Sequence, residues 1–286
     1  EHASLPIFSE LYMTKAAEYL KNYYPIFLFG AVFARLMEKG GMAASVAGKI
    51  IEILGEKRAV LAVLLGCGAL TYGGLSVFVV AFVMYPFGAV VFKKADIPKR
   101  LLPAALWMGI FSFAMVAMPG TPQIQNIIPS SYFGTSTWSG MGIGIFATLI
   151  FLFMGWAWIS FRAKRLKAQG EGYGKHIEYS QRRHKIPNPD WKVSVIPLVL
   201  VIVLNVFLSN PFHWDWAFHW DEGSLESLAP MHISLLAHSV AKISAGWSIT
   251  ISLIISSIVA AIIARRHLRI TEGMMSTING SAISSC

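Results

Sequence analysis

The stretch "AMVAMPGTPQIQNIIPSSYFG", residues 114–134, places prolines, amides and hydroxyls in the middle of an apolar run. It lies within a longer segment, from Leu101 to Phe161, that contains no Lys, Arg, Asp, Glu or His. Pro119 and Pro122 lack backbone N–H groups, so they break the helical ladder and leave free carbonyls before the break and free amides after it. The sequence therefore predicts a broken helix over residues 101–138.

The composition is that of an integral membrane protein. The 286 residues are 55% hydrophobic and 14% charged, with a mean hydropathy of +0.56. Several windows reach the roughly 20 apolar residues that cross about 30 Å of hydrocarbon. The net charge of +9 comes from Lys and Arg in short loops between these windows, which is the positive-inside pattern and indicates a lipid bilayer and no nucleic acid as partner. We expect an all-α, multi-pass protein of the plasma membrane, such as the bacterial inner membrane.

The segment that precedes the first long uncharged run predicts three elements. Residues 1–22 are expected to form an outer-interface helix, and Tyr23 to Met37 a first span that ends in the cytoplasm. In "GMAASVAGKIIEILG", residues 41–55, Met42, Val46 and Ile50 share one helical face while Lys49 lies off it. This pattern predicts a cytoplasmic surface helix.

Residues 59–92 predict a re-entrant hairpin. This segment has no charge and is flanked by "EKR" and "KKADIPKR", so both of its ends belong in the cytoplasm. If it breaks at "TYGG", the first arm, residues 59–70, rises about 18 Å, which is too little to cross. The tip, residues 71–76, would then stop near mid-depth. Two short complete spans are the alternative.

The rest of the chain divides at a basic segment. A span is expected over residues 139–161, followed by a cytoplasmic linker over residues 162–192 with nine Lys or Arg and three Asp or Glu. Residues 193–286 form a second, incomplete membrane unit. We expect the chain to be a fragment, because it begins without Met. His213 and His219 have no convincing ligand set nearby, so we assign them to the membrane interface and expect no metal or cofactor.

The tip and the break are expected to meet. If the helix that enters the membrane at Trp107 continues to Pro119, Pro119 lies about 18 Å deep at helical rise, as the tip does. Free backbone groups at that depth are costly unless a solute or water uses them. The candidate substrate-binding residues are Thr71, Tyr72, Gly73, Gly74, Ser76, Pro119, Gly120, Thr121, Pro122, Gln123, Gln125 and Asn126. A plain proline kink or an outer loop is the alternative.

This candidate site has donors but no fixed charge. Hydroxyls, amides and the half-helix N-termini after Gly74 and Pro122 suit a small, hydroxylated carboxylate. Unwound carbonyls can also hold Na⁺, for which Thr71, Ser76, Thr121 and Asn126 are the candidate ligands. Neither segment contains an Asp, Glu or His to carry a proton. The coupling ion, H⁺ or Na⁺, stays open.

A longer pattern resembles the gluconate permeases, proton-linked symporters of small hydroxy acids in the ion-transporter superfamily. It comprises residues 30–86, "IPKRLLPAALWMG" (97–109), "MPGTPQ" (118–123) and "TEGMMSTINGSAISSC" (271–286). The resemblance implies two inverted repeats, each with a re-entrant hairpin and a broken helix, and a homodimer. Residues 23–161 would be most of the first repeat and residues 193–286 the start of the second. The chain departs from that family by lacking an acid at the tip and a histidine at the break, so it would be a divergent member, and a hydroxybutyrate, a citrate-like acid or another monocarboxylate is as plausible as gluconate.

The function expected from these features is secondary active transport of a small organic anion, gluconate or a related hydroxycarboxylate. An ion exchanger or channel-like protein of the same superfamily, without an organic substrate, is the alternative. An enzyme is not expected, because no nucleophile–base pair, metal ligand set or phosphate-binding loop is present.

Overall fold

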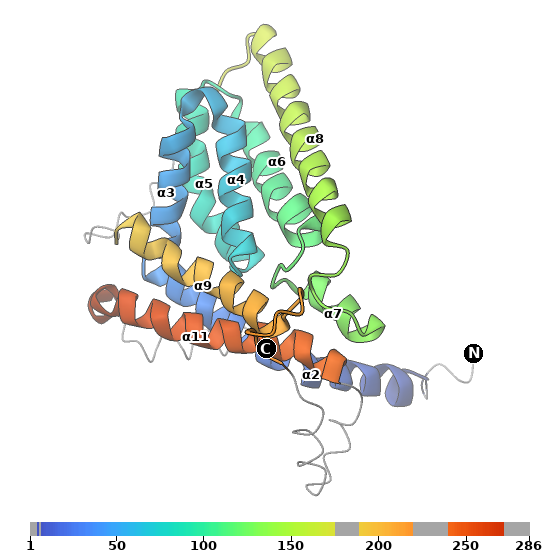
Figure 1. The fold of residues 1–286 in the computed structure, drawn as a ribbon. Helices are drawn as coiled ribbons and strands as arrows, with labels where there is room; N and C mark the ends of the chain where they lie inside the picture. The colour runs from blue at the N-terminus through green and yellow to red at the C-terminus, as the bar shows by residue number, and fades with distance from the viewer. Residues whose placement is uncertain (1–4, 6, 175–188, 220–239, 272–286) are drawn as a thin grey trace, which may run out of the picture.

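The computed structural model (Figure 1) describes residue 5 and residues 7–174, 189–219 and 240–271. Within these ranges the chain is helix and connecting loop, with no strand. The helices are η1 (Ile7–Tyr12), α2 (Met13–Lys39), α3 (Met42–Leu54), η2 (Glu56–Arg58), α4 (Ala59–Tyr72), α5 (Val77–Lys94), η3 (Lys99–Leu101), α6 (Leu102–Trp107), η4 (Met108–Ala117), α7 (Ile124–Phe133), α8 (Met141–Ala168), α9 (Trp191–Ser209) and α11 (Val240–Thr271).

Five segments of the described chain are long and apolar enough to cross a membrane. They are Val77–Lys94, Lys99–Ala117, Met141–Ala168, Trp191–Ser209 and Gly246–Arg265. The protein is therefore an all-α, multi-pass membrane protein, as its composition predicted.

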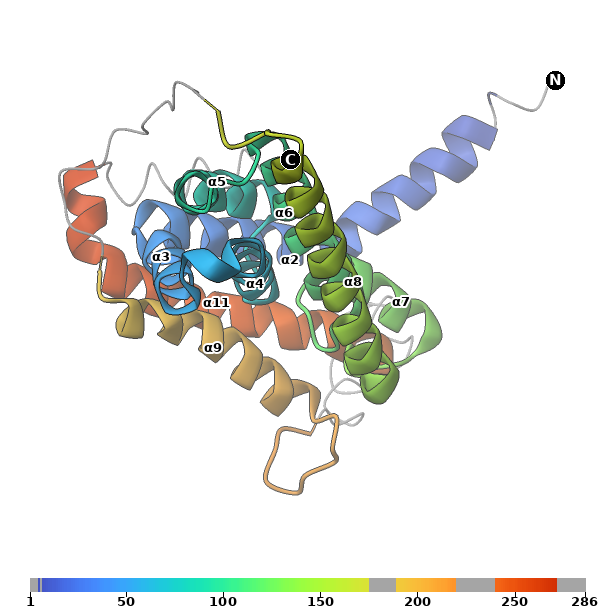
Figure 2. The same cartoon turned by 90° about the horizontal axis from the view of Figure 1, so that it is seen from above.

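The helices form two groups that run in different directions. Helices α3, α4, α5, α6 and α8 stand side by side, and α2, α9 and α11 run across one end of them (Figures 1 and 2). Helix α11 packs along both α2 and α9, and α3 packs against α9. Fully buried Phe33, Met37, Leu64, Met84 and Ile249 come from both groups, so one continuous core joins them.

Helix α2 is continuous across the boundary predicted at residue 22. It runs from Met13 to Lys39, with Pro25 in its interior. Residues 13–24 contain neither Gly nor Pro, so nothing in this segment ends the helix. The segment predicted for the interface and the first predicted span are thus parts of one helix, which also follows directly on η1.

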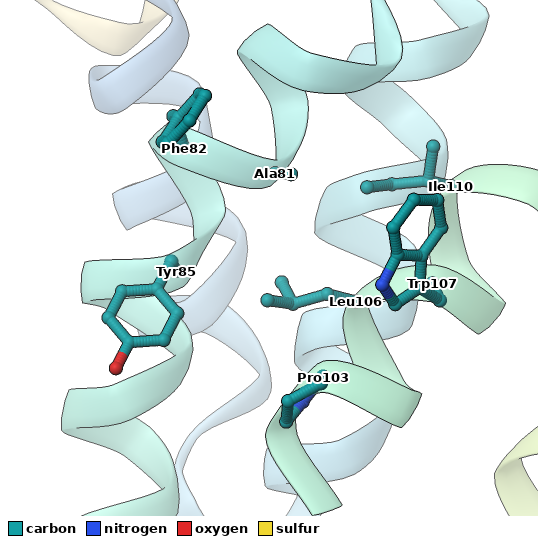
Figure 3. A pocket seen from close by; sticks show the side chains of 7 residues that line it. All are labelled: Ala81, Phe82, Tyr85, Pro103, Leu106, Trp107 and Ile110. Atoms are coloured by element: carbon teal, nitrogen blue, oxygen red, sulfur yellow. The ribbon is translucent and has the colours of Figure 1, made fainter.

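Helices α4 and α5 form the predicted hairpin, joined by Gly73, Gly74, Leu75 and Ser76. With 14 and 18 residues they are about 21 and 27 Å long. Helix α4 packs closely against η4, where a Cβ added to Gly109 would lie 2.7 Å from the Cβ of Cys67. On the outer side, an open groove separates α5 from α6 (Figure 3). The re-entrant position of the hairpin stays a prediction.

Ion pairs gather at the end of the bundle away from the hairpin tip. Lys94 pairs with Glu56 at 3.1 Å, and Lys167 of α8 pairs with Asp96 at 3.3 Å. Arg100 pairs with Glu171. The base of the hairpin, the start of α6 and the end of α8 therefore lie together, as expected for three segments assigned to the cytoplasm.

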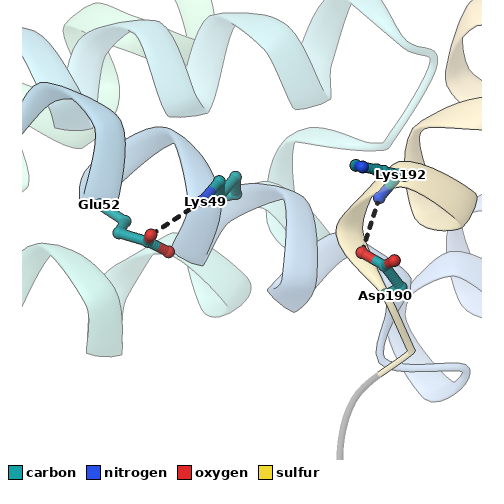
Figure 4. A network of polar contacts seen from close by, with 4 residues as sticks. All are labelled: Lys49, Glu52, Asp190 and Lys192. Carbon is teal, nitrogen blue, oxygen red and sulfur yellow. Dashed lines mark hydrogen bonds and ion pairs between the residues drawn. The ribbon is translucent and has the colours of Figure 1, made fainter.

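A second polar region lies where α3 meets the start of α9 (Figure 4). Ser45 donates to the carbonyl of Pro189 at 2.7 Å, and the carboxylate of Asp190 caps α9 by accepting from the backbone N–H of Lys192. Lys49 pairs with Glu52 at 2.8 Å and lies 5.8 Å from the ring centroid of Trp191. The start of the second membrane unit is thus hydrogen-bonded to the first turn of α3.

The Asp96 contacts predict a pH-dependent stability. The backbone N–H of Tyr173, followed by Lys167, lowers the pKa of Asp96 below its usual value of 3.8. A carboxyl with a lowered folded-state pKa contributes stability above its unfolded pKa and loses it as the pH falls through the folded value. We expect Asp96→Asn to lower the thermal unfolding midpoint at pH 6, and this difference to shrink as the pH falls below about 4. Glu52→Gln, which removes an exposed carboxylate on α3, is the control; equal effects of the two substitutions would contradict the prediction.

Candidate transport site

The hairpin tip and the helix break meet through two side chains. The Tyr72 hydroxyl donates to the carbonyl of Pro119 at 2.9 Å. The Gln123 amide donates to the carbonyls of Thr71 at 2.9 Å and Leu75 at 3.3 Å. We call these hydrogen bonds the tip–break clasp. They join segments that are far apart in the sequence, at the end of the bundle that faces α2, α9 and α11 (Figure 1).

The break itself is non-helical from Met118 to Gln123. Met118 and Gln123 are extended, and Gly120 has a φ of +74°. Gly120 also lies against Trp138, where an added Cβ would be 2.2 Å from the ring. At the tip, Gly74 has a φ of +92°, and a Cβ added there would contact Pro122 of the break, Leu253 of α11 and Phe33 of α2 at 3.4 to 3.8 Å. Both glycines are required by their left-handed conformation, and Gly120 also by the lack of space.

Side-chain amides satisfy the carbonyls that the break exposes. Asn126 donates to the carbonyls of Thr121 at 3.2 Å and Thr137 at 2.9 Å. The Gly120 N–H donates to the same Thr137 carbonyl at 2.8 Å. Where no water is present, these side-chain amides satisfy backbone carbonyls that would otherwise lack a hydrogen-bond donor. Gln123 and Asn126 therefore stabilise the backbone of the site.

The second membrane unit contributes Asn205, which the sequence analysis missed. Asn205 of α9 is 1% exposed and donates to the Gly120 carbonyl at 3.1 Å, while its side-chain oxygen accepts from Ser209 at 3.0 Å. Leu198 of the same helix packs on Gly73, where an added Cβ would lie 2.3 Å from Leu198 Cδ2. The signal that could have identified Asn205 in the sequence is an amide side chain within an uncharged span.

Around the tip and the break, three buried hydroxyls and an indole have no hydrogen bond among the described residues. They belong to Thr71, Thr121, Thr137 and Trp138. Thr71 and Thr121 are 0% exposed, one beside the tip and the other inside the break. A buried polar atom without a partner is costly, so these groups are the ones free to bind a solute or an ion.

Ten of the twelve predicted site residues come together at the tip and the break. They are Thr71, Tyr72, Gly73, Gly74, Pro119, Gly120, Thr121, Pro122, Gln123 and Asn126. Ser76 and Gln125 are exposed, and the structure gives their side chains no hydrogen bond. The role of these residues in binding substrate stays a prediction. The described residues contain no group of three or more metal ligands, and His219 lies near Asn210, 3.5 Å from its amide.

Comparison with known proteins assigns the family. A family model described as "CitMHS: Citrate transporter" matches residues 22–272. The chain belongs to this citrate transporter family. It is also 36% identical over 295 residues to the uncharacterized transporter YxjC of Bacillus subtilis (strain 168), an alignment that covers 98% of the chain. The chain spans 61% of the length of that relative. No solved structure matches it.

The expected membership of the gluconate permeases is wrong, because the family match is to the citrate transporters. The resemblance rested on the order of a span, a short helix, an uncharged hairpin and a proline-broken helix. Any transporter that places a hairpin and a broken helix in a bilayer can have this order of elements. The order therefore indicates the architecture and does not identify the substrate. The inverted repeat and the homodimer, inferred from the same resemblance, stay predictions.

We expect substitution of Gln123, at the end of the break, and of Gln125, in the first turn of α7, to affect stability and transport differently. Gln123→Ala removes both of its bonds to the tip and leaves buried carbonyls short of a donor, which costs about 1–3 kcal/mol. We expect a lower thermal unfolding midpoint and a loss of uptake in proteoliposomes. Gln125→Ala, the matched control two residues further on in the first turn of α7, removes an exposed side chain and should change stability by less than about 0.5 kcal/mol. If both variants transport normally, the clasp has no part in transport.

The hydrogen bond from Asn205 to Gly120 is expected to stabilise the contact between the two membrane units. Asn205→Ala leaves the buried Gly120 carbonyl without this donor, at a cost of about 1–3 kcal/mol. We expect uptake to fall, and amide hydrogen exchange within residues 118–123 to become faster because the break is less stable. Val203→Ala on an exposed face of α9 is the control. Unchanged uptake and unchanged hydrogen exchange in Asn205→Ala would refute this role of Asn205.

Proposed function

We propose that the full-length protein is a secondary active transporter of small hydroxylated carboxylates of the citrate type, driven by a proton or sodium gradient. Membership of the citrate transporter family supports the substrate class. The observation that carries the proposal is the clasp between hairpin tip and broken helix, which lies beside buried hydroxyls that have no partner among the described residues. Paired breaks of this kind are where secondary transporters bind substrate and coupling ion.

The chemistry of the site favours an anion bound by hydroxyls and backbone amides. Residues 59–92 and 101–161 supply no Lys or Arg, so no fixed cation would hold the anion permanently. A carrier has to release its cargo, and neutral donors bind a carboxylate without the strength of a buried ion pair. The N-terminus of α7, which follows Pro122 and Gln123, adds a partial positive charge.

We infer that Thr71 and Thr121 bind the substrate or the coupling ion. Gln123, Asn126 and Tyr72 already donate to backbone carbonyls, which leaves the two threonine hydroxyls as the buried polar groups without a partner among the ten predicted residues that come together. A hydroxyl oxygen can accept from a substrate hydroxyl, donate to a carboxylate or coordinate Na⁺. We further propose that the protein works as a transporter and not as an enzyme, since uncharged hydroxyls and amides make up the site.

Isosteric variants test these hydroxyls. Thr71→Val and Thr121→Val keep the shape of the side chain and remove only its polar atom. We expect each to reduce the uptake of labelled citrate by the full-length protein in proteoliposomes at least tenfold, corresponding to a lost hydrogen bond of about 1.4 kcal/mol or more. Thr148→Val is the matched control, because Thr148 Oγ1 donates to a carbonyl within α8 at 2.8 Å. Normal uptake by both site variants would show that these hydroxyls do not bind the cargo.

The same assay identifies the driving ion. Proton and sodium gradients are imposed separately across the vesicles, with citrate and other hydroxy acids as substrates. Accumulation under one gradient supports transport and names the ion. Dissipation of a gradient with no acid accumulated would refute the proposal in favour of an ion exchanger.

A further inference from the structure

An apolar groove between α5 and α6 lies away from the candidate transport site. Its volume is about 390 Å³. It is lined by Ala81, Phe82, Tyr85, Pro103, Leu106, Trp107 and Ile110. Figure 3 shows the α5 side chains on one wall and the α6 and η4 side chains on the other, with Pro103 and the Tyr85 hydroxyl towards the same end. The groove is therefore a slot that is apolar along its length and has the polar Tyr85 hydroxyl towards one end.

The walls of the groove belong to two candidate membrane spans, Val77–Lys94 and Lys99–Ala117. Phe82 is 65% exposed and Trp107 is 53% exposed, so the slot opens outward from the bundle. At the depth of an apolar span the surroundings of an open slot are hydrocarbon. An acyl chain is the occupant that this environment supplies.

The polar end of the groove lies beside basic residues. The Lys99 ammonium is 5.9 Å from the centroid of the Tyr85 ring, and exposed Lys93 follows two turns after Tyr85 on α5. Residues 56–58, 93–100 and 162–171, which meet at this end, contain ten Lys or Arg and three acids. Each of the three acids, Glu56, Asp96 and Glu171, is in an ion pair. This end of the bundle therefore has an excess of positive charge that attracts an anionic headgroup.

We propose that this groove is a binding site for an anionic phospholipid, with an acyl chain along the apolar walls and the phosphate at Lys99 and Lys93. The groove accommodates the acyl chain, and the basic end favours a negatively charged headgroup. The site should therefore bind phosphatidylglycerol in preference to phosphatidylcholine. A second copy of the chain fits less well, since a two-fold contact through this face would bring two sets of basic residues towards each other. The occupied groove would hold α5 and α6, the second arm of the hairpin and the helix that breaks, at a fixed distance.

The experiment measures lipid selectivity of the full-length protein. Purified protein is placed in vesicles of phosphatidylcholine with increasing phosphatidylglycerol, extracted in small native discs, and the bound lipids are counted by native mass spectrometry. Lys93→Gln/Lys99→Gln removes the headgroup contacts, and Ala81→Trp fills the slot. Lys15→Gln, in the exposed first turn of α2, and Ile143→Trp, on an exposed face of α8, are the matched controls.

We expect the parent and both controls to enrich phosphatidylglycerol. The enrichment should fall at least about fivefold in Lys93→Gln/Lys99→Gln, since a basic residue near an anionic surface contributes roughly that factor, and it should also fall in Ala81→Trp, because the acyl chain no longer has a slot to occupy. If Ala81→Trp keeps the full enrichment, attraction is spread over the basic end and the groove is not a lipid site. If Ala81→Trp instead converts a dimer to a monomer without changing the lipid count, the face binds a second copy, which also overturns the proposal. Equal binding of the two lipids by the parent protein would overturn it directly.

Discussion

Every backbone group that leaves a helix inside a bilayer needs a partner, because hydrocarbon offers none. The proline-interrupted segment exposes several carbonyls at one depth, and the structure supplies donors to them and to the tip from three directions. Gln123 reaches across to the tip, Asn126 turns back to Thr121 and Thr137, and Asn205 comes from the second membrane unit. The position of α9 against the bundle, the contact of tip and break and the path of residues 134–140 all depend on this requirement.

The two helix groups share a bilayer although they cross each other. Candidate spans occur in both groups, α5, η4 and α8 in one and α9 and α11 in the other, so a membrane normal that lets both groups cross is oblique to both (Figure 1). Helices α8 and α11, of 28 and 32 residues, are about 42 and 48 Å long and can cross at a tilt. Helix α4, about 21 Å long, cannot cross in any orientation. An oblique normal therefore strengthens the case for a hairpin that enters and leaves on one side.

Sequence reasoning located the breaks but not the partners of their backbone groups. Proline, glycine and the absence of charge are local signals, so the hairpin at residues 73–76 and the break at 118–123 could be placed from residue types alone. Asn205 and Trp138 could not, because their contribution depends on how α9 and the loop after α7 pack against the break. The family was misjudged for the same reason: local architecture is common to many transporters, whereas the family match extends over residues 22–272, most of the chain.

The structure also divides the polar residues of the site into two kinds. A glutamine or asparagine in an apolar span suggests a substrate ligand when only the sequence is considered, yet the amide nitrogens of Gln123 and Asn126 donate to carbonyls of the protein itself. An amide that moved to a substrate would leave those carbonyls bare in a dry site, at a cost comparable to the bond it gained. Hydroxyls without a partner carry no such penalty when they bind. Under the proposed function, Thr71 and Thr121 are therefore better suited than the amides to bind and release a solute repeatedly, while the amides stabilise the broken backbone.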